Sequence, residues 1–127
     1  MAKTIATLVG AVFILIGLCG FAVPNLLGAH LGTSHNIIHL VSGAISLYLG
    51  LKGTLAQART FCLVFGIVYA LLGVVGFLMG TGEHRMLDIN ALGLMLGTVD
   101  HIIHLVIGAL YLIGGLVTKS DVARATA

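Results

Sequence analysis

Two stretches of the chain carry nearly the same sequence: NLLGAHLGTSHNIIHLVSGAISLYLG at Asn25–Gly50 and NALGLMLGTVDHIIHLVIGALYLIGG at Asn90–Gly115. At an offset of 65 residues, 15 of the 26 aligned positions are identical. Apolar composition produces chance matches among Leu, Ile and Gly, but it does not repeat Asn, Thr and His in register. The chain is therefore predicted to contain two copies of one structural unit.

The segments before these stretches repeat as well. Val9–Phe21 aligns with Phe65–Phe77 at an offset of 56 residues, with several glycines and the final Phe in common. The two offsets differ by 65 − 56 = 9, so the second copy has nine extra residues in its loop. Glycines spaced by seven residues, such as Gly10 and Gly17, lie on one face of a helix, which predicts close approach of a neighbouring helix.

The composition excludes a soluble protein surface. Of 127 residues, 59% are apolar and only 8% are charged, and the mean hydropathy is +1.17. A soluble domain carries about 25% charged residues, so most of this surface must face the lipid bilayer. The net charge of +2 and the lack of a basic cluster exclude nucleic acid as a partner.

Four segments have the apolar character of membrane spans, which need about 20 residues. They are residues 5–23, 36–51, 60–79 and 101–117. We expect a single all-α domain, 1–127, folded as a membrane four-helix bundle of two tandem helix hairpins, with repeat 1 at 5–51 and repeat 2 at 60–117. Each repeat holds two spans, so both copies insert in the same direction and are related by a pseudo-two-fold axis along the membrane normal.

The charged residues predict the orientation in the membrane. If the four spans alternate in direction, the basic residues on one side are Lys3, Lys52, Arg59, Lys119 and Arg124. The other side carries Arg85 alone. The positive-inside rule therefore predicts a multi-pass protein of the inner (plasma) membrane, with both termini in the cytoplasm and the loops 24–35 and 80–100 outside.

Polar residues occupy equivalent positions near the starts of the second and fourth spans. They are His35, Asn36 and His39 in the first copy, and Asp100, His101 and His104 in the second. Residues four apart share a helix face, and the pseudo-two-fold axis brings both triplets to the outer mouth of the bundle. Helix capping explains Asp100 but not His39 and His104, which lie a turn further inside. Polar residues at membrane depth are costly, and this favours a functional role.

A metal ion is the first ligand that such a cluster fits. Imidazole nitrogen is a common ligand of zinc, copper and iron. The predicted ligands of Zn²⁺ or copper are His35, His39, His101 and His104. Asp100 is predicted to belong to the same metal site as a carboxylate that orients His104.

A tetrapyrrole is the alternative ligand. Gly43 and Gly108 follow His39 and His104 by four residues, which leaves room beside each imidazole for a flat macrocycle. The two histidines are then axial ligands of a b-type haem, or they hold a chlorophyll-like pigment. The competing interpretation of both glycines is simple helix packing. Proton handling or pH sensing is a third role for the cluster, but the inner halves of the spans lack the ionisable residues that a proton channel needs.

The other polar residues add no catalytic group. His30 and His84 are predicted to be solvated loop residues. The sequence has no nucleophile elbow, phosphate-binding loop or metalloprotease motif. We therefore expect that the protein is not an enzyme.

The two repeated stretches also carry a family resemblance. The chain resembles a bacterial family of small four-helix membrane proteins catalogued only as a domain of unknown function, whose helix starts read Asp-Asn-x-x-His-Leu-x-x-Gly. Residues 35–43 read HNIIHLVSG and differ at the first position, whereas 100–108 read DHIIHLVIG and differ at the second. The glycine-rich runs 15–21 and 63–80 look like the family too. The resemblance covers nearly the whole chain and implies its fold and membrane location, but no activity.

These observations lead to one functional prediction and two rivals. The prediction is a non-enzymatic membrane protein whose outer histidine cluster binds a metal ion or a tetrapyrrole. The first rival is an accessory subunit, without a cofactor of its own, of a larger respiratory, photosynthetic or transport complex. The second rival is a homo-oligomeric scaffold.

Overall fold

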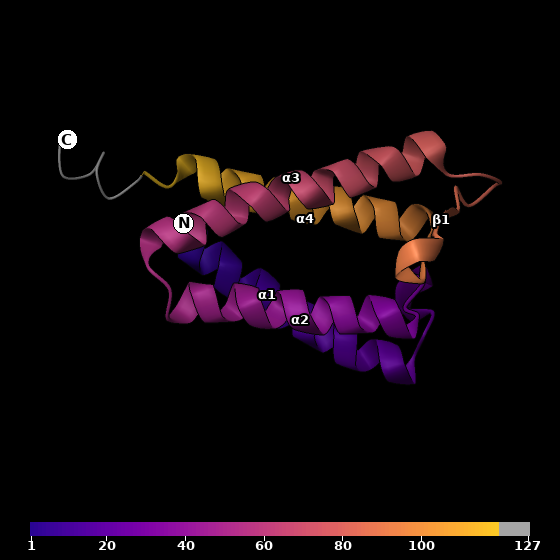
Figure 1. Ribbon diagram of the computed structural model, residues 1–127, viewed down its shortest axis with the longest axis horizontal. Helices are drawn as coiled ribbons and strands as arrows, with labels where there is room; N and C mark the ends of the chain where they lie inside the picture. Colours follow the sequence, from indigo (N-terminus) through magenta and orange to yellow (C-terminus); the bar gives the residue numbers. More distant parts are fainter. Residues whose placement is uncertain (120–127) are drawn as a thin grey trace.

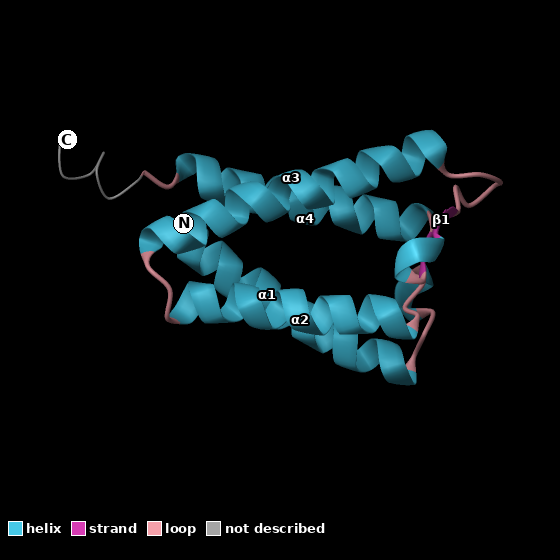
Figure 2. Ribbon diagram, in the orientation of Figure 1, coloured by secondary structure: helices cyan, strands magenta, loops and turns pink. Residues whose placement is uncertain are grey.

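The computed structural model describes residues 1–119, and four α-helices make up most of that part of the chain (Figures 1 and 2). Arg124, which contributes to the predicted charge bias, lies outside the described residues. The helices are α1 (Ala2–Ala22), α2 (Thr33–Leu51), α3 (Leu55–Met79) and α4 (Thr98–Val117). The predicted four-helix architecture is therefore confirmed, with helices that begin a few residues before the expected spans.

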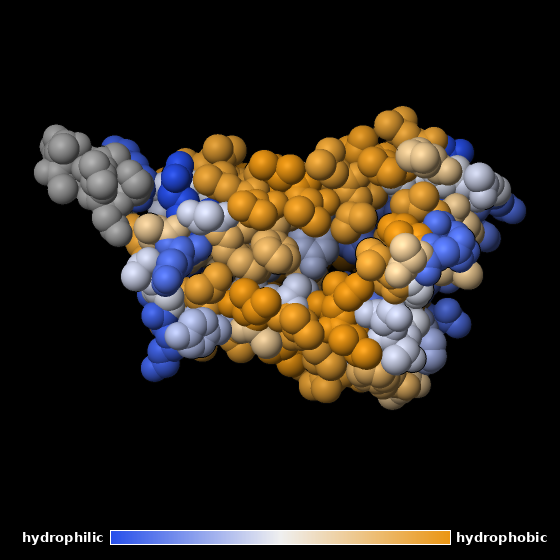
Figure 3. Space-filling model, in the orientation of Figure 1, coloured by the Kyte–Doolittle hydropathy of each residue, from blue (hydrophilic) through white to orange (hydrophobic). Residues whose placement is uncertain are grey.

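Three of these helices, α1, α3 and α4, are long and apolar enough to cross a membrane. The remaining helix, α2, has 19 residues, but its buried face carries histidine, asparagine and serine side chains. Large apolar side chains are exposed along all four helices, and they form a broad band over the visible face, broken near its middle by a few paler groups, with hydrophilic residues at the two ends (Figure 3). This distribution supports a membrane protein, because water would not tolerate an apolar surface of that extent.

The helices form two tightly packed hairpins, α1 with α2 and α3 with α4 (Figure 1). A methyl group added at Gly10 would lie 2.6 Å from the backbone nitrogen of Leu47 on α2. A methyl group added at Gly66, the repeat equivalent of Gly10, would lie 2.9 Å from the backbone nitrogen of Leu112 on α4. Both contacts are too short for any side chain, so the prediction that these glycines allow close helix approach is confirmed.

The loops at one end of the bundle contain short regular elements, including two strands that the sequence did not predict. Each loop has one 3-10 turn, η1 (Leu26–Gly28) and η2 (Asn90–Leu92). The second loop also has two antiparallel strands, β1 (Leu87–Ile89) and β2 (Leu94–Leu96). The prediction of a purely α-helical fold is therefore corrected in one detail, since the second loop contains a short β-hairpin. Its nine extra residues give this loop enough chain to pair with itself.

The interior between the hairpins is aromatic and partly polar. Phe13, Phe61, Tyr69 and Tyr111 are buried there. The Tyr111 hydroxyl lies 2.8 Å from Oγ of Ser46, which donates a hydrogen bond to the carbonyl of Ala6. The Tyr69 hydroxyl donates to Oγ of Ser42 at 3.4 Å. The two tyrosine–serine hydrogen bonds join helices of different hairpins.

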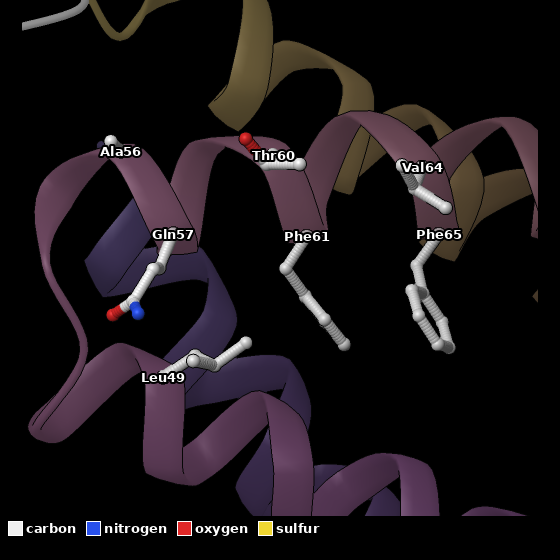
Figure 4. Close-up of a pocket in the computed structure, with 7 residues that line it drawn as sticks. All are labelled: Leu49, Ala56, Gln57, Thr60, Phe61, Val64 and Phe65. Atoms are coloured by element: carbon white, nitrogen blue, oxygen red, sulfur yellow. The ribbon is translucent and has the colours of Figure 1, made fainter.

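A large apolar groove of about 490 Å³ opens between α2 and α3 near the start of α3 (Figure 4). Its lining residues are Leu49, Ala56, Gln57, Thr60, Phe61, Val64 and Phe65. The groove holds no histidine, cysteine or acidic residue, and it is at the opposite end of α2 from the predicted histidine cluster. The groove is therefore separate from the candidate site.

Candidate metal centre

Three of the predicted ligands meet between the hairpins near the loop end of the bundle. His35 and His39 come from α2 and His104 from α4, and each side chain is buried. One ring nitrogen from each histidine lies within 4.8 Å of the other two. Three nitrogens that surround one ion at about 2.1 Å are about 3.4–3.6 Å apart in tetrahedral or trigonal geometry. A decrease of about 1.2 Å in the longest nitrogen–nitrogen distance would therefore bring the His triad, defined as His35, His39 and His104, into coordination range.

The backbone fixes the tautomer of His35. Its Nδ1 lies 2.7 Å from the carbonyl oxygen of His30, and because a carbonyl can only accept, Nδ1 must carry the proton and donate it. Nε2 therefore keeps its lone pair. Metal-binding histidines commonly donate their second ring nitrogen to a carbonyl or carboxylate in this way, which orients the ring and raises its basicity as a ligand.

Each member of the His triad has a buried ring nitrogen without a hydrogen-bond partner among residues 1–119. These atoms are Nε2 of His35, Nδ1 of His39 and Nδ1 of His104. Buried polar atoms are nearly always satisfied, and leaving one unpaired costs about 1–3 kcal/mol. The three histidines that carry these nitrogens line one small cavity.

Aromatic neighbours hold the two deeper imidazoles in place. The ring of Phe13 stacks on His39 with centroids 5.0 Å apart and planes within 6°. Tyr69 packs against His104 with centroids 5.6 Å apart. Phe13 and Tyr69 are equivalent residues of the two repeats, as are His39 and His104. Each repeat therefore supplies one imidazole and the aromatic ring that supports it.

A cavity of about 30 Å³ lies among the three imidazoles. A space of this size holds one ion or about one water molecule. Leu94 and Leu96 of β2 line its loop side with 7% and 1% of their surfaces exposed, so the unexpected hairpin shields the site from water. Pockets for organic cofactors are at least tenfold larger, about 300 Å³ or more.

The room predicted beside Gly43 and Gly108 is filled by neighbouring helices. A methyl group added at Gly43 would lie 2.9 Å from the carbonyl oxygen of Gly10 on α1. One added at Gly108 would lie 2.6 Å from the backbone nitrogen of Ala70 on α3. The expectation that these glycines leave a slot for a macrocycle is therefore corrected, because backbone packing uses that space.

His101 and Asp100 have other partners than the His triad. Nε2 of His101 donates to the carbonyl of Arg85 at 2.8 Å, and its ring packs against Gly76 and Phe77. The Asp100 carboxylate accepts hydrogen bonds from the Gly97 backbone at 2.8 Å and from His30, rather than from His104. The structure thus does not bring these two predicted residues together with the other three.

His30 has a structural role that the sequence did not indicate. Its backbone nitrogen and its Nδ1 both donate to the Asp100 carboxylate, at 3.1 and 3.2 Å. Its carbonyl accepts from His35. The prediction of a solvated loop residue holds only in part for His30, because this partly exposed loop residue also connects the first loop to α4. His84 is exposed, as expected. The alignment of His30 with Met95 gave no signal for this role, because loop contacts follow no helical periodicity.

These features define a helical, membrane-type bundle of two hairpins that enclose a shielded histidine triad. Residues 3–117 match the family model described as a domain of unknown function (DUF4383), so the chain belongs to that family. This match confirms that the chain belongs to a family of unknown function. No curated protein and no solved structure matches the chain.

Proposed function

We propose that the protein is a four-pass, non-enzymatic membrane protein that binds one transition-metal ion, zinc or copper, at His35, His39 and His104. The observation that carries the proposal is the set of three unpaired, buried ring nitrogens around a cavity of about 30 Å³. One of them, Nε2 of His35, is kept in its ligating form by the backbone. Imidazole sites suit zinc, copper, iron and nickel.

Three neutral imidazoles leave a fourth coordination position open for a water molecule or an anion. They also leave the charge of the ion uncompensated in a shielded cavity. Asp100, which is 2% exposed, supplies a buried carboxylate one helical turn before His104 on α4. The Asp100 carboxylate accepts a hydrogen bond from Nδ1 of His30, and the carbonyl of His30 accepts one from Nδ1 of His35. We infer that Asp100 acts on the site through this chain and not as a direct ligand.

We further propose that a pseudo-two-fold axis along the membrane normal relates the two hairpins. Three residues contact their own repeat equivalents, as expected for residues next to such an axis. Phe13 and Tyr69 have ring centroids 5.3 Å apart, Ser46 hydrogen-bonds to Tyr111 at 2.8 Å, and His39 meets His104 in the His triad. With α2 running beside α1 as α4 runs beside α3, four passes and cytoplasmic termini follow from the charge bias.

The test is metal analysis of the protein purified in mild detergent, after exchange against Zn²⁺ or copper. We expect one ion per chain. The His39→Phe variant keeps a ring stacked on Phe13 but removes both nitrogens, so its metal content should fall at least tenfold. His84→Phe is the matched control, because His84 is exposed. A metal-free wild type, an unchanged metal content of His39→Phe, or a Soret band with stoichiometric haem would each contradict the proposal.

A further inference from the structure

A second group of metal-ligand side chains lies between the His triad and the loop end of the bundle. A vestibule of about 260 Å³ opens between the first loop and the residues that precede and form β2. Its lining includes His30, His35 and Met95. His35 also lines the cavity of the His triad, so this one imidazole separates the vestibule from the buried site.

His30 is oriented in the vestibule with one free nitrogen. Its Nδ1 lies 3.2 Å from Oδ2 of Asp100, and the carboxylate can only accept, so Nδ1 carries the proton. The lone pair is then on Nε2. The backbone nitrogen of His30 also donates to Asp100, which fixes the position of the residue. With 37% of its side chain exposed, His30 is accessible from solvent.

Two methionines lie in the same region as this imidazole. Met95, the repeat equivalent of His30, lines the same vestibule and is 53% exposed. A methyl group added at Gly97 would lie 3.0 Å from Nδ1 of His30 and 3.2 Å from the sulfur of Met86. Nδ1 of His30 and the sulfur of Met86 therefore lie at most about 6 Å apart, on either side of the same point beside Gly97. The loop end thus combines one oriented imidazole with two methionines.

The chemistry of this donor set differs from that of the His triad. Thioethers are soft, neutral ligands that favour copper(I), whereas zinc prefers nitrogen, thiolate and carboxylate donors. A site of neutral donors also favours an ion of single charge, because burying a charge costs less when the charge is smaller. A site with methionine at two of three positions would therefore favour copper(I) over zinc.

We propose that His30, Met86 and Met95 form a loading site for copper(I), which passes through the vestibule to Nε2 of His35 and then into the His triad. The transfer is a ligand exchange in which the ion keeps its charge and no electron moves. This inference rests on the proposed metal site, and it adds the identity of the ion and its route.

The experiment measures uptake of copper(I) from its bicinchoninate complex by the purified, metal-free protein under anaerobic conditions. The double variant Met86→Leu/Met95→Leu removes both sulfurs at nearly constant volume. We expect its initial rate of copper(I) uptake to fall at least tenfold, with a final ratio of one copper per chain. Its rate of Zn²⁺ uptake should change less than twofold. The control is Met79→Leu, which changes an exposed methionine at the end of α3, outside the vestibule.

Each other outcome overturns a defined part of the reasoning. An unchanged copper(I) rate in the double variant would refute the loading site. A wild type that binds Zn²⁺ but no copper(I) would refute the copper(I) route and leave the His triad as a metal site. A wild type that binds neither ion would refute the proposed function itself. Equal slowing of Zn²⁺ and copper(I) in the double variant would refute the selective role of the thioethers.

Discussion

Replacing Gly10 with alanine tests how closely the two helices of a hairpin must approach. The added methyl group would lie 2.6 Å from the Leu47 nitrogen and 2.9 Å from the Gly43 carbonyl oxygen. Both atoms belong to the backbone of α2, so no side chain can turn away. Restoring an ordinary contact of about 3.4 Å requires α1 and α2 to separate by about 0.8 Å, which is the overpacking that costs about 1–3 kcal/mol.

The net effect also includes helix propensity, since alanine in a helix interior is favoured over glycine by about 1 kcal/mol. With backbone on both sides of the contact, we expect an overpacking cost of about 2–3 kcal/mol and a net loss of about 1–2 kcal/mol. For a chain of this length a loss of 1 kcal/mol lowers Tm by about 4 °C. Thermal unfolding in mild detergent, followed by circular dichroism, should therefore show a fall of about 4–8 °C.

The matched control is Gly114→Ala in α4. There the nearest atom is the terminal methyl of Ile5, at 2.9 Å, and this flexible group can move. We expect no loss of Tm, because the gain in helix propensity remains. Gly66→Ala, the repeat equivalent of Gly10→Ala, should lower Tm by a similar amount. An unchanged Tm for Gly10→Ala, or an equal fall for Gly114→Ala, would refute the packing argument.

Three further predictions concern the His triad, the hydroxyl pairs and the orientation. Zn²⁺ at a free concentration of 100 times its Kd should raise the free energy of unfolding by about 2.7 kcal/mol; the increase in Tm should disappear in His39→Phe, and an equal increase in that variant would contradict the site. Ser46→Ala leaves the Tyr111 hydroxyl buried without its partner and should lower the free energy of unfolding by about 1–3 kcal/mol. Tyr111→Phe should lower it less, by about 1 kcal/mol. Thermal unfolding compares the two variants, and a larger loss for Tyr111→Phe would contradict the hydrogen bond between Ser46 and Tyr111. In a background without native cysteines, a membrane-impermeant thiol reagent added outside should label Glu83→Cys and not Lys52→Cys, whereas labelling of Lys52→Cys alone would invert the orientation.

Much of the fold could be predicted because the repeat and the apolar runs reflect simple physical requirements. The four helices follow from the need to satisfy backbone hydrogen bonds in lipid. The start of α3 at Leu55 rather than at residue 60 follows from a capping box between Thr54 and Gln57. Strands β1 and β2 were not predicted, because the nine extra residues have no counterpart in the first repeat.

The His triad could be predicted only in part. His39 and His104 stood out because capping did not explain polar residues a turn inside the helix. The sequence repeat could not distinguish His101 from these two histidines. It shows which positions are equivalent, but not which neighbouring residue each side chain faces. In the structure the ring of His101 packs against Gly76, as the Asn36 side chain packs against Gly20. The glycine faces that allow close packing of the helices thus also accommodate these two side chains.

The hydroxyl pairs between the hairpins have a mechanical consequence. In lipid, apolar surfaces gain little by associating with one another rather than with acyl chains, so smooth apolar contacts would let the hairpins slide along the membrane normal. A slide by the rise of two residues, about 3 Å, would lengthen the 2.8 Å contact between the Tyr111 hydroxyl and Ser46 to about 4.1 Å when the bond lies across that direction, which is beyond hydrogen-bond length. The same slide would carry His104 away from His35 and His39. The serine–tyrosine pairs therefore fix the position of one hairpin relative to the other along the membrane normal. That position in turn determines the spacing of the three imidazoles.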